Sequence, residues 1–146
     1  MNVNFDHSDA TRYISEQIAR IPETMHRERK QILTKSAKLL KSTVEKSLRA
    51  IESNVSEGTT NYDGSLPYVH MADDVKTSVK DDKEGNVYAI IRGGKTTGYK
   101  WHLVNNGTSS PDRTATHFIE KALKDTEEEM DSYINEAIGR AVQGGD

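Results

Sequence analysis

The stretch GGKT at residues 93–96 is the part of the chain whose residue types most strongly suggest nucleotide chemistry. It follows an apolar run that predicts a strand, as in a phosphate-binding loop. Such a loop also needs a glycine five positions before the one that precedes the lysine, and Ala89 occupies that position. A helix should begin at Lys95, yet Gly98 follows almost at once. We therefore interpret the stretch as a flexible turn that ends a hairpin.

Other residue types that carry out chemistry are present but are not grouped into a recognisable site. The chain has no cysteine, and no two of its five histidines have the i, i+4 spacing of metal ligands on one helix face. Neither HExxH nor GxSxG occurs. We predict that the protein is not an enzyme and has no catalytic residue, cofactor or metal ligand. A small hydrolase with a metal site assembled from distant residues is one alternative that stays open.

Length and charge place further bounds on the protein. Its 146 residues predict a single domain, residues 1–146, and the apolar content of 34% predicts a modest core or one completed by a partner. Residues 1–53 carry ten Lys or Arg against seven Asp or Glu, whereas residues 111–146 carry four against nine. The two ends could therefore attract each other, within one subunit or between subunits. No apolar stretch approaches the ~20 residues of a membrane span, so we expect no membrane partner.

A long helical pattern dominates the first third of the chain. Apolar residues recur at steps of three and four over residues 10–52, which is helical periodicity. Pro22 would split this range and open a second helix, because proline is tolerated only in the first turn. Arg29 fills the one polar place in the apolar stripe.

Four basic side chains share one face of that helical range. We interpret this face as solvated, or as paired with the acidic last helix. A small nucleic-acid-binding or regulatory protein that uses the basic first helix is the second alternative, although no aromatic residues are interleaved for base stacking. The four residues are Lys35, Lys38, Lys46 and Arg49.

A polar loop and a hairpin follow. Residues 53–69 are rich in Ser, Thr, Asn and Gly, and we predict that this loop is mobile in the free subunit and ordered by neighbours. Alternating apolar residues over 74–92, around a turn at 81–86, predict a β-hairpin that needs a helix or another subunit over it. The order long helix, hairpin, long helix predicts an α+β fold with a small antiparallel sheet.

The segment 98–114 joins the hairpin to the last helix. Residues 99–105 suit either a short helix or a third strand, and Asn106-Gly107 turns the chain. The C-terminal helix is predicted over about 115–142, with its start near 110–112 or capped by Thr114.

Large aromatic side chains gather in and beside this joining segment. They are typical of a core and also of a protein interface. We assign Phe118 to the core and Trp101, beside Tyr99, to an interface, because its neighbours Lys100 and His102 are polar.

The stretch 98–123, GYKWHLVNNGTSSPDRTATHFIEKAL, resembles a pattern of the head–tail joining proteins of long-tailed phages, also called neck or tail-completion proteins. In that pattern an aromatic segment precedes Gly-Thr and small polar residues, and a Phe then opens a helix with Ala three or four residues later. The family commonly has an acid and an aromatic residue before Gly-Thr, where this chain has Asn105-Asn106. The matching residues are Tyr99, Trp101, Gly107, Thr108, Ser109, Ser110, Phe118 and Ala122.

The resemblance implies a structural virion protein, made in the bacterial host cytoplasm, of a phage or prophage. It implies a homo-oligomeric ring, a hexamer or dodecamer, at the head–tail junction, between head-closure or connector proteins and tail-terminator proteins. DNA would pass close by in the lumen. Heterologous ring contacts would suit a basic first helix and an acidic last helix. The interface residues that it suggests are Tyr99, Trp101, His102, Asn106, Gly107, Thr108, Pro111 and Phe118, with virion assembly depending on Trp101 and Phe118.

Overall fold

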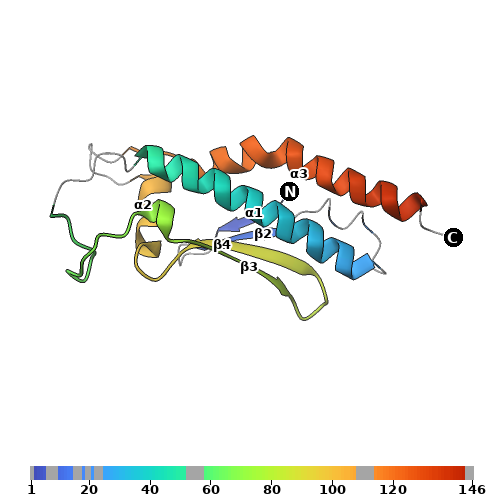
Figure 1. The fold of residues 1–146 in the computed structure, drawn as a ribbon, viewed down its shortest axis with the longest axis horizontal. Helices are drawn as coiled ribbons and strands as arrows, with labels where there is room; N and C mark the ends of the chain where they lie inside the picture. The colour runs from blue at the N-terminus through green and yellow to red at the C-terminus, as the bar shows by residue number, and fades with distance from the viewer. Residues whose placement is uncertain are drawn as a thin grey trace.

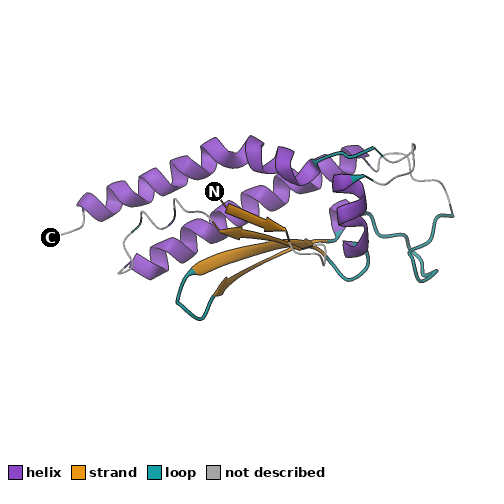
Figure 2. Cartoon of the chain, turned by 180° about the vertical axis from the view of Figure 1, so that it is seen from behind, coloured by secondary structure: helices purple, strands orange, loops and turns teal. Residues whose placement is uncertain are grey.

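The chain forms a four-stranded antiparallel sheet with two long helices on one side of it (Figure 1, Figure 2). The computed structural model describes residues 2–5, 10–14, 18, 21, 25–51, 58–107 and 114–143. This architecture confirms the predicted α+β class and the order long helix, hairpin, long helix. The strands are β1 (Asn2–Phe5), β2 (Ala10–Ile14), β3 (Val75–Asp81) and β4 (Val87–Gly93). The helices are α1 (His26–Ile51), α2 (Trp101–Asn106) and α3 (Phe118–Gln143), with single 3-10 turns η3 (Met71–Asp73) and η4 (Gly98–Lys100).

The first strands correct the prediction that a helix begins at residue 10. β2 pairs with β1 on one side and with β4 on the other, with Ala10 opposite Arg92 and Tyr13 opposite Ala89. The strand order is β1-β2-β4-β3. A strand partner from a distant part of the chain overrides the helical spacing of a few apolar residues, because pairing and burial decide strand formation more than local sequence does.

α1 is the helix that the apolar stripe predicts, with a later start. It begins at His26, and Pro22 lies outside the described residues. Arg29 occupies the polar place in the stripe and is only 9% exposed. Its Nε donates a hydrogen bond of 2.7 Å to the carbonyl of Ile21. The guanidinium therefore ties the chain before α1 to the helix, which explains a charged residue in an otherwise apolar stripe.

The hairpin of β3 and β4 lies where the alternation predicts it. The turn is closed by the Asp82 carboxylate, which accepts bonds from the backbone of Glu84 at 3.0 Å and of Asn86 at 2.8 Å. One face of the hairpin, here called the inner face, packs against α1 and carries the buried residues Val75, Val87, Ala89 and Ile91. The opposite, outer face carries Lys76, Ser78, Lys80, Tyr88, Ile90 and Arg92.

α3 packs along α1, so the first and last long helices meet within one subunit (Figure 1). The Nζ atom of Lys35 lies 4.0 Å from the centre of the Tyr133 ring. The Tyr133 hydroxyl donates to Glu129 Oε1 at 3.1 Å. Burial, followed by this bond, raises the pKa of Tyr133 above its usual value. The two helices therefore meet here through a cation–π contact, and attraction between the basic and acidic ends stays a prediction.

The start of α3 differs from the prediction by three residues. Residues 114–117 are not helical, and α3 begins at Phe118. The backbone amides of Thr116 and His117 donate instead to the carbonyls of Val104 and Asn105, at 3.1 and 3.0 Å. The φ angle of His117 is 52°, a conformation that cannot continue a right-handed helix. The candidate start at 110–112 lies outside the described residues.

The polar loop predicted over 53–69 contains a side-chain-organised turn. Its first part, up to residue 57, lies outside the described residues. Farther on, Asn61 Nδ2 donates to Ser65 Oγ and to the carbonyl of Pro67, both at 3.0 Å, and Asn61 Oδ1 accepts from the Val69 amide at 2.8 Å.

Mobility of this loop in the free subunit stays a prediction. We expect proteases to cut the isolated protein between Ser56 and Asn61 before any other site. The hydrogen bonds of Asn61 should slow cleavage between Asn61 and Val69. Limited proteolysis with mass spectrometry locates the cuts, and resistance throughout 54–69 would contradict the prediction.

Candidate functional site

The GGKT stretch forms a tight turn around a carboxylate of the protein itself. β4 ends at Gly93, and the Gly94 amide donates to the carbonyl of Asp74 at 2.7 Å. The Asp74 carboxylate, on a residue 8% exposed, accepts bonds at Oδ2 from the Thr97 amide at 2.9 Å and the Thr97 hydroxyl at 2.8 Å. A side chain on Gly94 would overlap this carboxylate. The amide and hydroxyl that could have faced a phosphate therefore already hold an anion.

Nucleotide hydrolysis is not expected from this turn. A bound phosphate would have to displace Asp74 or sit beside its negative charge. We predict no ATP or GTP turnover by the purified protein above that of a Lys95→Ala variant. A phosphate-release assay with both proteins tests this, and turnover that Lys95→Ala abolishes would contradict it.

Beside this turn, the joining segment folds inward. Trp101 and Phe118 are each 1% exposed, and their rings meet edge to face with centroids 5.2 Å apart at 78°. Gly93 makes room for the indole, because a side chain there would overlap Trp101 and approach the Gly98 Cα atom to 2.5 Å. Through Trp101, the segment therefore packs the end of β4 against Phe118, the first residue of α3.

Asn105 makes a second connection between α2 and α3. Asn105 is 2% exposed, and its Oδ1 accepts a bond of 3.0 Å from the amide of Ile119 in the first turn of α3. Its Nδ2 donates to Glu120 Oε1 at 3.2 Å and to Asn106 Oδ1 at 3.0 Å. The side chain thus satisfies a helix-end amide that has no partner within the helix.

Replacing Asn105 with alanine should lower the free energy of unfolding by about 1–3 kcal/mol, because a buried amide would lose its acceptor. Asn105→Asp would keep the acceptor and suit the positive helix end, but would set its charge against Glu120. We expect Asn105→Asp to lie between the wild type and Asn105→Ala in urea denaturation. Equal stability of Asn105→Ala and the wild type would contradict this role.

The joining segment also borders an exposed aromatic patch, formed by Tyr62 and Tyr99. Tyr62 is 86% exposed and Tyr99 39%. The rings of Tyr62 and Tyr99 lie 5.2 Å apart, centre to centre. A hollow of about 250 Å³ between the two tyrosines is lined by Asn61, Tyr62, Asp63, Lys95, Thr96 and Tyr99.

The suspected interface residues separate into buried and exposed groups. Trp101 is buried within the subunit, so its assignment to an interface is wrong for the single chain. Because α2 is a helix, polar residues next to Trp101 in the sequence do not imply that Trp101 itself faces solvent. Phe118 is buried, as predicted. Tyr99, His102 and Asn106 are exposed, and Gly107, with φ of 76°, ends α2. Thr108 and Pro111 lie outside the described residues.

The sequence also left some residues of this region unassigned. Asp74 and Tyr62 take part in it through contacts with Thr97 and Tyr99, which are distant in sequence. Only Tyr62, a large side chain in a polar loop, could have been singled out from the sequence.

No protein-family model, curated protein or solved structure matches this chain. Within the described residues there is no group of three or more His, Asp or Glu that could hold a metal ion. Likewise, no helix in the described part is long and apolar enough to cross a membrane.

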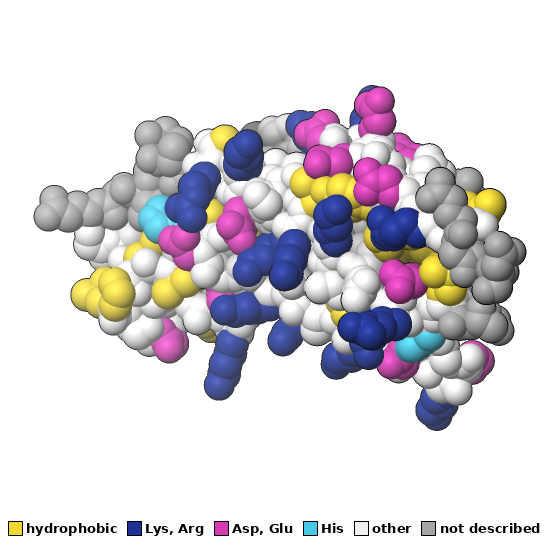
Figure 3. Space-filling view, turned by 45° about the vertical axis from the view of Figure 1, so that its right-hand side comes forward, with side chains coloured by type: hydrophobic (Ala, Val, Ile, Leu, Met, Phe, Trp, Pro, Cys, Tyr) yellow, Lys and Arg dark blue, Asp and Glu magenta, His cyan; other side chains and the backbone are white. Residues whose placement is uncertain are grey.

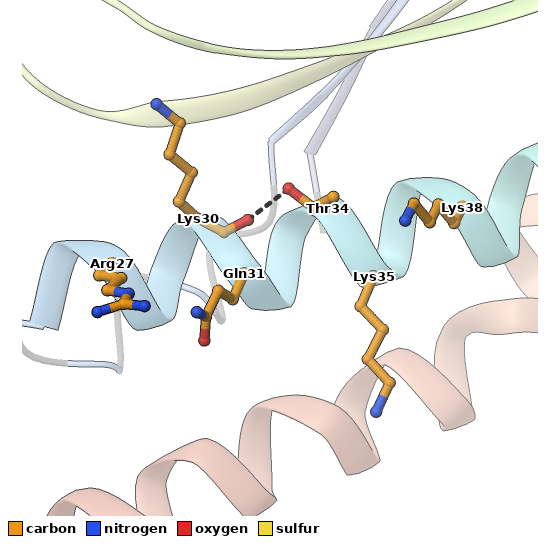
Figure 4. Close-up of a pocket in the computed structure, with 6 residues that line it drawn as sticks. All are labelled: Arg27, Lys30, Gln31, Thr34, Lys35 and Lys38. Carbon is orange, nitrogen blue, oxygen red and sulfur yellow. Dashed lines mark hydrogen bonds between the residues drawn. The ribbon is translucent and has the colours of Figure 1, made fainter.

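The basic face of α1 is the other candidate surface. It contains a shallow hollow of about 440 Å³ lined by Arg27, Lys30, Gln31, Thr34, Lys35 and Lys38. Figure 4 shows that Lys30 and Lys35 point in opposite directions, toward the sheet and toward α3. Lys30 lies 3.3 Å from Asp81, and Arg49, farther along, lies 2.6 Å from Asp73. Lys30 and Lys35 diverge, and Lys30 has an acidic partner, so the hollow does not focus charge on one anion.

Proposed function

We propose that this protein is a structural subunit of the head–tail junction of a long-tailed phage or prophage. It would form a homo-oligomeric ring between head-closure or connector proteins and tail-terminator proteins of the virion. It would act through its surfaces, without catalysis.

The observation that carries this proposal is that four of the described residues of the resemblance belong to one structural unit. Trp101 and Phe118 form the buried aromatic pair, Gly107 ends α2, and Ala122 is fully buried on α3. The burial of Trp101, Phe118 and Ala122 supports the proposal by giving the aromatic and alanine residues of the pattern a common structural role. The aromatic patch beside this unit supplies exposed large side chains of the kind that interfaces favour.

Genetic complementation tests the proposal. Deleting the gene from the phage or prophage should leave DNA-filled heads and free tails that do not join, as seen by electron microscopy. Adding the purified protein to these parts should restore infectious particles. Mass spectrometry of purified virions should find the protein. Infectious virions that form without the protein would contradict the proposal.

The alternative is a nucleic-acid-binding or regulatory protein that uses the four basic residues lining the hollow on α1. Such binding would weaken steeply with salt, because each phosphate contact releases a counterion. Lys38→Glu, in the hollow, would then abolish it, and Lys83→Glu, in the hairpin turn, would not. Fluorescence anisotropy with duplex DNA at several salt concentrations distinguishes this function from the proposed one.

A further inference from the structure

The outer face of the sheet is a basic surface. In the register of β3 and β4, Lys76 lies opposite Arg92 and Lys80 lies opposite Tyr88. Lys76, Lys80 and Arg92 are exposed, and Ile90 beside them is half-buried. Figures 1 and 2 show both long helices on the other side of the sheet, so neither covers this face.

The basic surface continues past the end of β4 into a groove. The groove has a volume of about 740 Å³ and is lined by Lys76, Thr77, Arg92, Gly93, Gly94, Lys95, Gly98 and Tyr99. Three of these residues are cationic and none is acidic. The buried Asp74 carboxylate lies against Gly94 and accepts hydrogen bonds from Thr97. It offsets part of this charge, and the groove keeps an excess of positive charge beside the aromatic ring of Tyr99.

α3 carries the opposite charge. Its residues 125–136 include six carboxylates and no Lys or Arg. Met130 and Ile134 of this stretch are buried, whereas Glu127 and Glu128 are exposed and Asp131 is half-buried. The helical spacing places these three acids away from the buried stripe. Glu127, Glu128 and Asp131 are called the acidic side of α3 below.

The two charged surfaces lie on opposite sides of the subunit. In Figure 1 α3 runs along the top and the outer face of the sheet looks downward. In Figure 3 acidic side chains gather at the upper right, together with some Lys and Arg, and several Lys and Arg side chains project from the lower edge, near which some Asp and Glu also lie. One copy cannot bring the two surfaces together, but two copies in a head-to-tail arrangement can.

We infer that the outer face of the sheet of one subunit binds the acidic side of α3 of the next. This inference rests on the proposed ring and names its subunit contact. It replaces the expected contact between first and last helices, because α1 and α3 already pack against each other within the subunit. A second copy fits better than nucleic acid, because each copy brings its own acidic surface to complement the basic face of the next.

Charge reversal tests the contact. Lys76→Glu/Arg92→Glu should raise the dissociation constant for self-association roughly tenfold or more, and Glu127→Lys/Glu128→Lys should do the same, because like charges would then face each other. Mixing the two variants should restore association, since each would offer the surface that the other has lost. Lys83→Glu, outside the contact, is the matched control and should assemble as the wild type does.

Sedimentation velocity at low and high salt measures association, and circular dichroism checks that each variant is folded. Wild-type association should weaken with salt, because exposed ion pairs are screened. A wild type that stays monomeric, or a folded Lys76→Glu/Arg92→Glu variant that assembles normally, would overturn the inference. Duplex DNA binding that this variant loses while it still assembles would also overturn it, in favour of nucleic acid. Whether purified virions contain the protein, as measured by mass spectrometry, tests the proposed function separately.

Discussion

Replacing Trp101 with alanine should lower the free energy of unfolding of the isolated subunit by about 3–5 kcal/mol, the usual effect of removing a buried large aromatic side chain. Trp101 is 1% exposed, packs on Phe118 and fills the space that Gly93 leaves open. Collapse around the vacated space would be limited, because the end of β4 and the start of α3 are both held by backbone hydrogen bonds. The expected loss is therefore in the upper half of this range.

Differential scanning calorimetry measures this effect. In a domain of this size 1 kcal/mol corresponds to about 2–4 °C, so the melting temperature should fall by roughly 8–20 °C. Tyr99→Ala is the matched control, since Tyr99 is 39% exposed and its truncation should cost little. A Trp101→Ala protein that melts like the wild type would contradict the burial of this side chain.

Burial also changes how the expected dependence of virion assembly on Trp101 is to be tested. If Trp101→Ala unfolds the subunit, particles fail for a reason unrelated to the interface. Trp101→Phe keeps an aromatic ring against Phe118 and should retain most of the stability. We expect Trp101→Phe to support assembly, whereas Tyr62→Ala/Tyr99→Ala, which removes the exposed patch, should impair joining in a folded subunit.

Gly94→Ala should be strongly destabilising, as should Gly93→Ala, because an added Cβ atom at either position would overlap neighbouring atoms. A Cβ atom at Gly94 would overlap Asp74 Oδ1 and lie 2.7 Å from Asp74 Cγ. Overpacking of this kind typically costs about 1–3 kcal/mol. Moving the carboxylate away would also leave the buried Thr97 amide without its acceptor, which costs about 1–3 kcal/mol more.

A double-mutant cycle makes this prediction specific. Asp74→Ala removes the group that the new methyl would strike, so Gly94→Ala should cost less in the Asp74→Ala background than in the wild type. Gly139→Ala is the matched control, since nothing lies within 4 Å of its added Cβ atom and alanine favours a helix by about 1 kcal/mol. Urea denaturation of the wild type, Gly94→Ala, Asp74→Ala, the double variant and Gly139→Ala gives the coupling free energy between positions 74 and 94. Additive effects at positions 74 and 94 would contradict the proposed clash.

The sequence predicted the elements whose stability is local. The stripe of α1 and the alternation of β3 and β4 each repeat over enough residues to set their structure, and even Arg29 was marked as the one irregular position in the stripe. β2 was mistaken for helix because three isoleucines at steps of four and three mimic helical spacing, while its partner β4 lies far along the chain. Pairing between distant segments produces no repeating pattern in the sequence from which it could be predicted.

The candidate site was predictable only in its aromatic residues. Trp101 and Phe118 stood out by type, but α2 had to be known as a helix before the burial of Trp101 could follow. The bond between Asp74 and Thr97 joins residues on either side of the hairpin, and no spacing rule connects them. The basic outer face of the sheet depends on the register of β3 and β4, which places Lys76 opposite Arg92.

The central position of β2 in the sheet has a consequence for how the chain folds as it is made. The hairpin and the helices can form from neighbouring residues, but β4 gains its second partner only when residues 10–13 reach residues 89–92. Such distant pairing forms slowly, because a long loop must close first. Until then one edge of β4 stays unpaired, and an unpaired edge is a template for strands of other chains. Overproduced subunits would therefore aggregate through β4 during folding, and slower synthesis at lower temperature should raise the soluble yield.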